Sequence, residues 1–186
     1  MIKTHKLLTL LLLAILLPRT DAAAEALFPQ EITLAEESFQ KLGEYRYVYR
    51  FFFELYEAAL YAPADATAEE VLEAATPYRL QFRYLRTIDK GIILKSADRM
   101  LEKNLSSEER DQIAERIDRI NAAYTTVNKG DTSSLTYQPD SGTTLKVNGE
   151  PKITIEGEDF AQLYFRIWLG PQPISKSLKA NLLGRD

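Results

Sequence analysis

The chain has 186 residues, the length of one ordinary domain, and 45% of them are hydrophobic, which is enough to form a core. It has no cysteine and a single histidine, His5 near the N-terminus. Disulfides, Ser-His-Asp or Cys-His nucleophilic sites, and thiolate or imidazole metal sites are therefore excluded from the rest of the chain. A formal net charge of −4 argues against nucleic acids and anionic lipid surfaces as partners.

The first 24 residues are typical of a secretory signal peptide. Lys3 and Lys6 precede an apolar run at residues 7–17, and three alanines at 22–24 supply a cleavage site. The alternative, a retained membrane anchor, is less favoured because a spanning helix needs about 20 apolar residues. We therefore expect a signal peptide at 1–24, a mature domain at 25–186 and a periplasmic or secreted protein.

Two strands are expected after the leader. Residues 28–34 can form a short one. Residues 44–60 alternate for most of their length, and one parity carries six large apolar side chains: Tyr45, Tyr47, Tyr49, Phe51, Phe53 and Leu55. A single strand of that length would exceed the usual 3–10 residues, so we expect a bend or bulge within it.

The middle of the chain predicts one strand and three helices. A short helix at 68–75 ends before Pro77, and residues 78–84 alternate as a strand with one apolar face. Apolar residues at helical spacing predict a helix over 92–103. Ser106 and Glu109 form a capping box for a further helix that runs to about residue 124.

The C-terminal third predicts two hairpins followed by two helices. The segment 139–142 is a strong turn signal between strands at 135–137 and 144–147. Asn148-Gly149 favours a tight turn into a strand at 153–155. Asp159 is expected to open a helix over 160–169, which Gly170 closes, and a last helix is expected over 175–183.

These elements predict an α+β domain with a mostly antiparallel sheet covered by helices. No internal repeat or linker divides the chain. Neither a Gly-x-x-x-x-Gly-Lys loop nor a Gly-x-Gly-x-x-Gly turn is present, so we expect no nucleotide and no other cofactor.

Four polar side chains are candidates for a ligand cleft. Arg46, Arg50 and Tyr56 share one parity of the expected strand at 44–60 and would face the same side of the sheet. The alternative is a solvated face with charges of both signs. Arg86 follows the next strand, where it could line the cleft or bind loop carbonyls as a structural arginine.

Five segments resemble a known family. They are 50–63, with its three adjacent phenylalanines, then Tyr84-Leu85-Arg86, Lys129-Gly130-Asp131, Val147-Asn148-Gly149 and Ile167-Trp168-Leu169-Gly170. In this order they resemble the chalcone-isomerase-like family, in its bacterial secreted branch. The resemblance implies an open-faced β-sandwich and covers nearly everything after the leader.

The family contains plant chalcone isomerases and relatives that bind fatty acids. In both, the resemblance implies a ligand-contacting arginine on the aromatic strand, matched here by Arg46 or Arg50. It also implies a ligand contact at Tyr56. The region 89–96 lacks the tyrosine and asparagine that the plant enzymes place there, which weakens the case for catalysis.

We therefore expect a small amphipathic ligand, such as a fatty acid, to be bound without a reaction. The arginine would then hold its carboxylate. One alternative is an intramolecular lyase that acts on an enone substrate. Another is an envelope protein that uses its surface to engage a protein partner and binds no small ligand.

Overall fold

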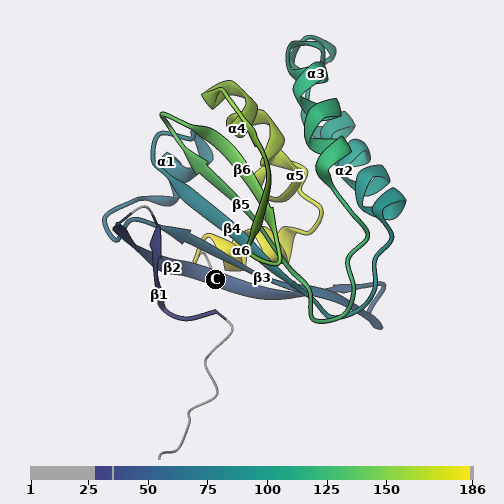
Figure 1. The fold of residues 1–186 in the computed structure, drawn as a ribbon, viewed down its shortest axis with the longest axis horizontal. Helices are drawn as coiled ribbons and strands as arrows, with labels where there is room; N and C mark the ends of the chain where they lie inside the picture. The colour runs from purple at the N-terminus through teal and green to yellow at the C-terminus, as the bar shows by residue number, and fades with distance from the viewer. Residues whose placement is uncertain (1–27, 35, 185–186) are drawn as a thin grey trace, which may run out of the picture.

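The computed structural model describes residues 28–34 and 36–184, so the expected signal peptide and its cleavage site lie outside the described residues. Seven strands form one curled antiparallel sheet in which every strand pairs with its neighbours in sequence (Figure 1). In order they are β1 (Glu31–Leu34), β2 (Glu37–Tyr49), β3 (Phe53–Ala62), β4 (Tyr78–Tyr84), β5 (Thr132–Gln138), β6 (Gly142–Val147) and β7 (Glu150–Ile155).

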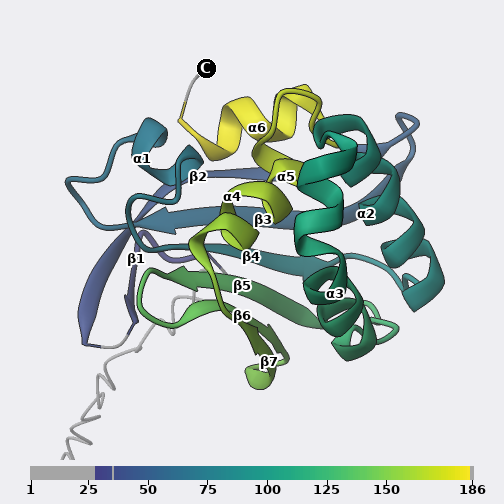
Figure 2. The same ribbon diagram turned by 90° about the horizontal axis from the view of Figure 1, so that it is seen from above.

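Six helices complete the described part of the chain, and α2 to α6 lie over one face of the sheet (Figure 2). They are α1 (Ala68–Leu72), α2 (Lys90–Asn104), α3 (Ser107–Ala123), α4 (Glu158–Tyr164), α5 (Arg166–Leu169) and α6 (Lys176–Leu182). The α+β class and the open-faced arrangement expected from the sequence are confirmed. None of the described helices combines the length and the apolar composition that crossing a bilayer requires.

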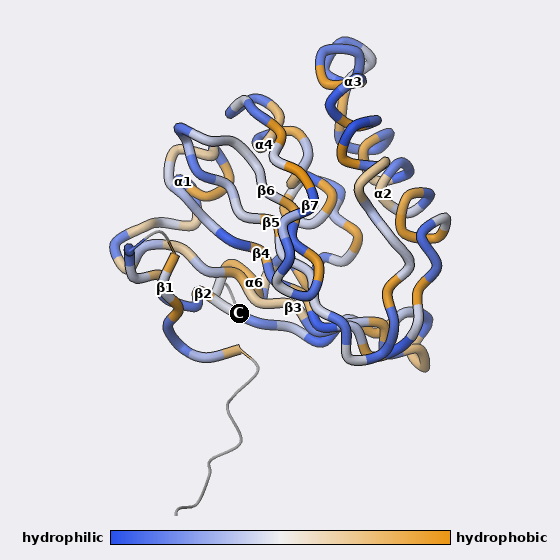
Figure 3. Tube along the Cα trace, viewed as in Figure 1, coloured by the Kyte–Doolittle hydropathy of each residue, from blue (hydrophilic) through white to orange (hydrophobic). Residues whose placement is uncertain are grey.

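The main core fills the space between this helical layer and the sheet. On β4 the inward residues are buried, namely Tyr78, Leu80, Phe82 and Tyr84, while the intervening residues are half-buried on the other face. Helix α3 contributes one buried stripe of isoleucines and is otherwise polar, as its alternating hydropathy shows (Figure 3). The strand over 78–84 and the capping box at Ser106 are confirmed.

A smaller apolar cluster lies on the opposite face of the sheet. Phe28 and Phe39 pack there with Tyr61, whose hydroxyl donates a hydrogen bond to the Pro29 carbonyl at 2.9 Å. The segment before β1 therefore covers this end of the outer face.

The largest departure from the sequence prediction is the segment 44–60. It does not form one bent strand: β2 ends at Tyr49, the chain reverses, and β3 begins at Phe53. Residues 50–52 form the turn, and two of them, Arg50 and Phe51, have φ of 49° and 64°. Apolar and polar residues alternate along both β2 and β3. The sequence pattern therefore shows no interruption at the turn that joins them.

The helix expected over 160–169 is also different. It begins two residues earlier and is divided into α4 and α5 at Phe165. Gly157 occupies the N-cap position, with φ of 103° and no side-chain cap. Asp159 instead accepts two hydrogen bonds from the Arg116 guanidinium, at 2.7 and 2.6 Å, which ties α4 to α3. Both turn predictions, at 139–142 and at Asn148-Gly149, are confirmed.

Candidate functional site

An apolar cavity lies between the sheet and the N-terminal half of α2. Its floor is formed by aromatic residues of β2, β3 and β4: Tyr47, Tyr56, Phe82 and Tyr84. Ile92, Ile93 and Ala97 of α2 lie on the other side, and Trp168 of α5 also lines the cavity. Among the described residues that line this cavity, none is charged. The site therefore suits an apolar ligand.

The hydroxyl of Tyr56 is the polar group that this cavity leaves unsatisfied. The side chain is buried, and its Oη has no hydrogen-bond partner within the described residues. Burial raises the pKa of Tyr56 and the nearby Trp168 indole lowers it, although these two side chains do not have the geometry of a hydrogen bond. A buried hydroxyl without a partner is unfavourable, so a ligand oxygen at this position would be stabilising.

The neighbouring hydroxyls are already paired. Tyr84 Oη and Ser133 Oγ form a hydrogen bond of 2.9 Å, and the hydroxyl of Tyr164 donates to that of Tyr124 at 3.3 Å. Burial raises the pKa of Tyr56, Tyr84 and Tyr124 above the usual value, so all three hydroxyls stay protonated at neutral pH. The cavity thus offers neutral donors and acceptors rather than a base.

The volume of this partly open cavity is about 100 Å³. Ligand pockets for small molecules usually measure about 300–1,000 Å³, and a 150 Å³ cavity holds one benzene. The first turns of α2 are its loosest wall, because Ile92 is 63% exposed and Ile93 and Ala97 are only half-buried. A ligand longer than a few methylenes would therefore displace this part of α2.

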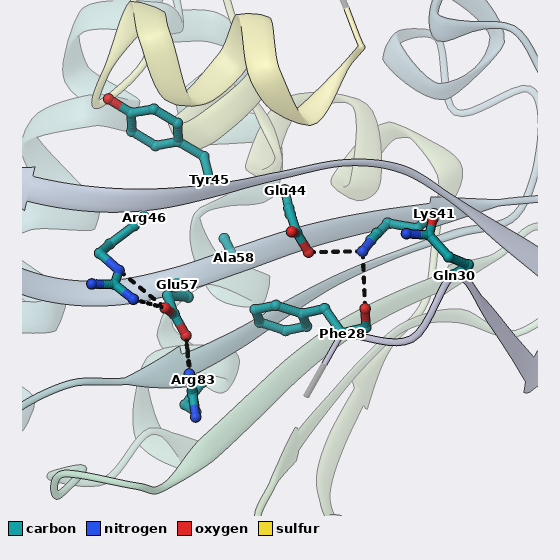
Figure 4. Close-up of a pocket in the computed structure, with 9 residues that line it drawn as sticks. All are labelled: Phe28, Gln30, Lys41, Glu44, Tyr45, Arg46, Glu57, Ala58 and Arg83. Atoms are coloured by element: carbon teal, nitrogen blue, oxygen red, sulfur yellow. Dashed lines mark hydrogen bonds and ion pairs between the residues drawn. The ribbon is translucent and has the colours of Figure 1, made fainter. Parts of the chain in front are cut away.

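A second, polar hollow of about 590 Å³ lies on the outer face of the sheet (Figure 4). Arg46 and Arg83 both point at the Glu57 carboxylate, with Arg46 Nη2 at 2.7 Å from Oε1 and Arg83 Nε at 2.9 Å from Oε2. Burial alone would raise the pKa of Glu57, but hydrogen bonds from Arg83 and Arg46 hold it below its usual value. Arg46 and Arg83 are both paired with this carboxylate, so the three side chains form an ion-pair network.

The structure separates the four candidate residues instead of joining them in one cleft. In the β2–β3 register Tyr47 pairs with Tyr56, whereas Arg46 pairs with Glu57, so Arg46 and Tyr56 lie on opposite faces. Arg50 lies in the turn and is exposed. The expectation that Arg46 or Arg50 shares a cleft with Tyr56 is therefore wrong, because the chain reverses between them. Tyr56 alone lines the apolar cavity.

Arg86 lies on the exposed loop between β4 and α2, outside the cavity lining. Its guanidinium lies 5.1 Å from the ring centre of Phe53, a cation–π contact at the base of the β2–β3 turn. It therefore belongs to the hairpin end of the molecule.

Several cavity residues were not singled out in the sequence. Trp168 was noted within a family motif; it packs on Phe82, Tyr164 and Phe165 and also lines the cavity. Ser133 was not considered at all. The sequence offers one indication of its role: Ser133 is a small polar residue on the same face of its strand as the apolar residues Leu135 and Tyr137.

Comparisons with known proteins agree with this fold. The family model described as chalcone isomerase-like matches residues 22–184. No match is found among curated proteins. Among solved structures, the crystal structure of a fatty-acid binding protein of Arabidopsis thaliana is similar. Its TM-score is 0.64 at 14% sequence identity, and the match covers 84% of this chain and 91% of that one. With the family model matching most of its length, this chain belongs to the chalcone isomerase-like family.

Proposed function

We propose that the protein binds a small hydrophobic ligand with one hydrogen-bonding end, such as a fatty acyl compound, without catalysing a reaction. The observation that carries this proposal is the unpaired Tyr56 hydroxyl, buried at the wall of an apolar cavity. The structural similarity to a plant fatty-acid binding protein supports the same class of ligand.

The chain of such a ligand would supply most of the affinity. Burial of each methylene contributes about 0.8 kcal/mol, whereas one neutral hydrogen bond to Tyr56 contributes about 1 kcal/mol. Since none of the described lining residues is charged, an ionised carboxylate in the cavity would be desolvated without a counter-charge. The end that meets Tyr56 is therefore neutral: a protonated acid, an alcohol or an ester.

Catalysis has less support than binding. The described lining residues include no carboxylate, lysine or arginine, and burial raises the pKa of the cavity tyrosines. A general acid or base works best with a pKa near the operating pH, and none of these groups has one. The lyase remains the alternative that the family membership keeps open.

Tyr56→Phe should change stability and binding in opposite directions. Removal of the unpaired hydroxyl should stabilise the ligand-free fold by about 1 kcal/mol, because no hydrogen bond is lost and a buried polar group disappears. The same change should weaken a long-chain alcohol about fivefold, because the ligand loses its hydrogen-bond donor. Thermal unfolding and titration calorimetry with a matched alcohol, methyl ester and acid would measure both effects.

Tyr137→Phe is the matched control. Its hydroxyl is also buried without a partner, but Tyr137 does not line the cavity. This variant should gain stability and leave binding unchanged. A Tyr56→Phe protein that is less stable, with unaltered affinity for all three ligands, would contradict the proposed site.

We also propose that the protein is exported and acts in the periplasm or outside the cell, on the strength of the leader at 1–24. N-terminal sequencing of the protein from its native envelope should begin near Glu25. Recovery of the uncleaved chain in the membrane fraction would contradict export by cleavage.

A further inference from the structure

The β2–β3 turn carries the most exposed aromatic residues of the described chain. We call residues 49–53 the aromatic tip. Phe51 and Phe52 are 95% and 84% exposed, and Tyr49 and Phe53 are each 45% exposed. Large apolar side chains this exposed and this close together on one protrusion usually mark an interaction site.

The backbone of the aromatic tip is unfavourable for the residues that form it. Arg50 and Phe51 both have positive φ, a region that suits glycine and asparagine and is rare for a bulky residue. The same chain makes its β6–β7 turn with Asn148 and Gly149, at φ of 51° and 82°. A turn alone would therefore be better served by that pair. The arginine and the phenylalanine found at these positions therefore point to a use for their exposed side chains.

Two cations flank the rings of the aromatic tip. The Arg50 guanidinium lies 5.3 Å from the ring centre of Tyr49, and that of Arg86 lies 5.1 Å from the ring centre of Phe53. Neither arginine forms an ion pair within the described ranges, whereas nearby Glu54 and Glu57 are both held by Arg46. The tip thus combines apolar rings with available positive charge.

We propose that the aromatic tip docks on the surface of a lipid bilayer, with Phe51 and Phe52 inserted among the headgroups and Arg50 and Arg86 on the phosphates. Aromatic side chains favour the membrane interface, and arginines beside them reach lipid phosphates while their stems stay apolar. A stable protein interface would need about 800 Å² of complementary surface on each partner. The tip is instead a narrow point, which suits insertion into a soft surface.

The position of the aromatic tip gives this docking a purpose. Tyr47 and Leu55, two residues from either side of it, line the apolar cavity. Both ribbon views place the turn and the first turn of α2 at the same end of the molecule (Figures 1 and 2). A docked protein would therefore hold the loose wall of the cavity near the bilayer. The docking proposal depends only on the residues of the aromatic tip and the arginines beside it. It goes beyond the proposed ligand binding and does not require it.

The net negative charge of the chain predicts no affinity for anionic lipid, but the charge close to the aromatic tip is positive. The chain as a whole carries −4, but Arg50 in the aromatic tip and Arg86 on the neighbouring β4–α2 loop have no acidic partner among the described residues. Reversible contact at this point needs no spanning segment. We expect the rings to suffice for binding to neutral vesicles and anionic lipid to strengthen it.

The absence of cysteine allows a site-specific test on the chain from residue 25, without the leader, because an introduced cysteine is the only labelling position. A polarity-sensitive fluorophore would be attached at Phe52→Cys or, as a matched control, at Ala114→Cys on the exposed face of α3. Each protein would be titrated with phosphatidylcholine vesicles, with and without phosphatidylglycerol, that carry a quencher at the headgroup end of the acyl chains. The label at 52 should be quenched and that at 114 should not. Adding Phe51→Ser should raise the lipid concentration needed for quenching by at least about tenfold.

The other outcomes would overturn the proposal. Equal quenching at both positions would show that another part of the chain holds the protein on the vesicle. Absence of quenching at 52 would show that the tip does not insert. A dimer in sedimentation experiments without lipid, broken by Phe51→Ser, would assign the tip to a second copy of the chain instead.

Discussion

Ala97→Phe should lower the affinity for a long-chain alcohol or ester by more than about 100-fold while leaving the protein folded. Ala97 lies on the half-buried face of α2 and lines the apolar cavity. A phenyl ring there would occupy most of a space of about 100 Å³. Exclusion of about four methylenes would remove about 3 kcal/mol of binding free energy.

Stability should change little in the same variant. A ring added to a filled core costs about 1–3 kcal/mol, but this ring would enter a cavity whose α2 wall is half-exposed. We therefore expect the free energy of unfolding to stay within about 1 kcal/mol of the original. Calorimetry and chemical denaturation would measure the two quantities separately.

Ala114→Phe provides the control for this substitution. It makes the same change on the exposed face of α3, away from the cavity lining, so both affinity and stability should be preserved. If Ala97→Phe binds the ligand as well as the original protein, the ligand does not use this cavity. That result would leave the docking of the aromatic tip untouched.

Much of the fold could be predicted because the local signals agree with the tertiary structure. The strand over 78–84 alternates cleanly because one face packs against helices and the other is open. The capping box at Ser106 fixes the start of α3 through local hydrogen bonds that need no tertiary partner. The dipeptide Asn148-Gly149 predicts a tight hairpin turn by itself, because both residues accept positive φ.

The candidate site was harder to predict because it depends on where the aromatic segment reverses. The turn at Arg50-Phe51 has none of the glycine, asparagine or proline that marks turns, so the alternation was read as continuous. One unrecognised turn reverses the chain, and the parity of Arg46 no longer predicts the face of Tyr56. Tyr56 itself was proposed both from its parity on the expected strand and from the family resemblance, whose motif at 50–63 begins at the turn.

The remaining cavity residues come from segments that are far apart in the sequence. Ser133, Tyr124, Ile167 and Tyr47 meet only through the sheet register and the packing of α2 and α5. No spacing along the sequence encodes that meeting. The helical stripe on α2 was correctly identified as apolar, but the sequence could not show that its first half leaves a cavity.

Gly43→Ala should destabilise the fold by about 3 kcal/mol, although alanine is a small side chain. Gly43 lies on β2 beneath the end of α6, and a Cβ there would lie 1.8 Å from the carbonyl oxygen of Asn181. The backbone of α6 would have to move away, and α6 carries the fully buried Leu178 and Leu182. The melting temperature should fall by roughly 6–12 °C for a domain of this size.

Gly149→Ala separates this steric effect from backbone strain. Gly149 has a φ of +82° but open space around it, whereas Gly43 has no such φ and is confined only by α6. We expect Gly149→Ala to cost about 1 kcal/mol through strain alone. A Gly43→Ala variant no less stable than Gly149→Ala would show that α6 is not tightly seated on β2.

A double variant tests whether the displacement of α6 is the cause. Leu182→Ala alone should cost about 2–5 kcal/mol, because it empties a fully buried position that anchors α6. If Gly43→Ala acts by pushing the same helix away, the double variant should lose less stability than the sum of the losses in the two single variants. Fully additive losses in denaturant unfolding would place the strain of Gly43→Ala within the sheet instead of at the seat of α6.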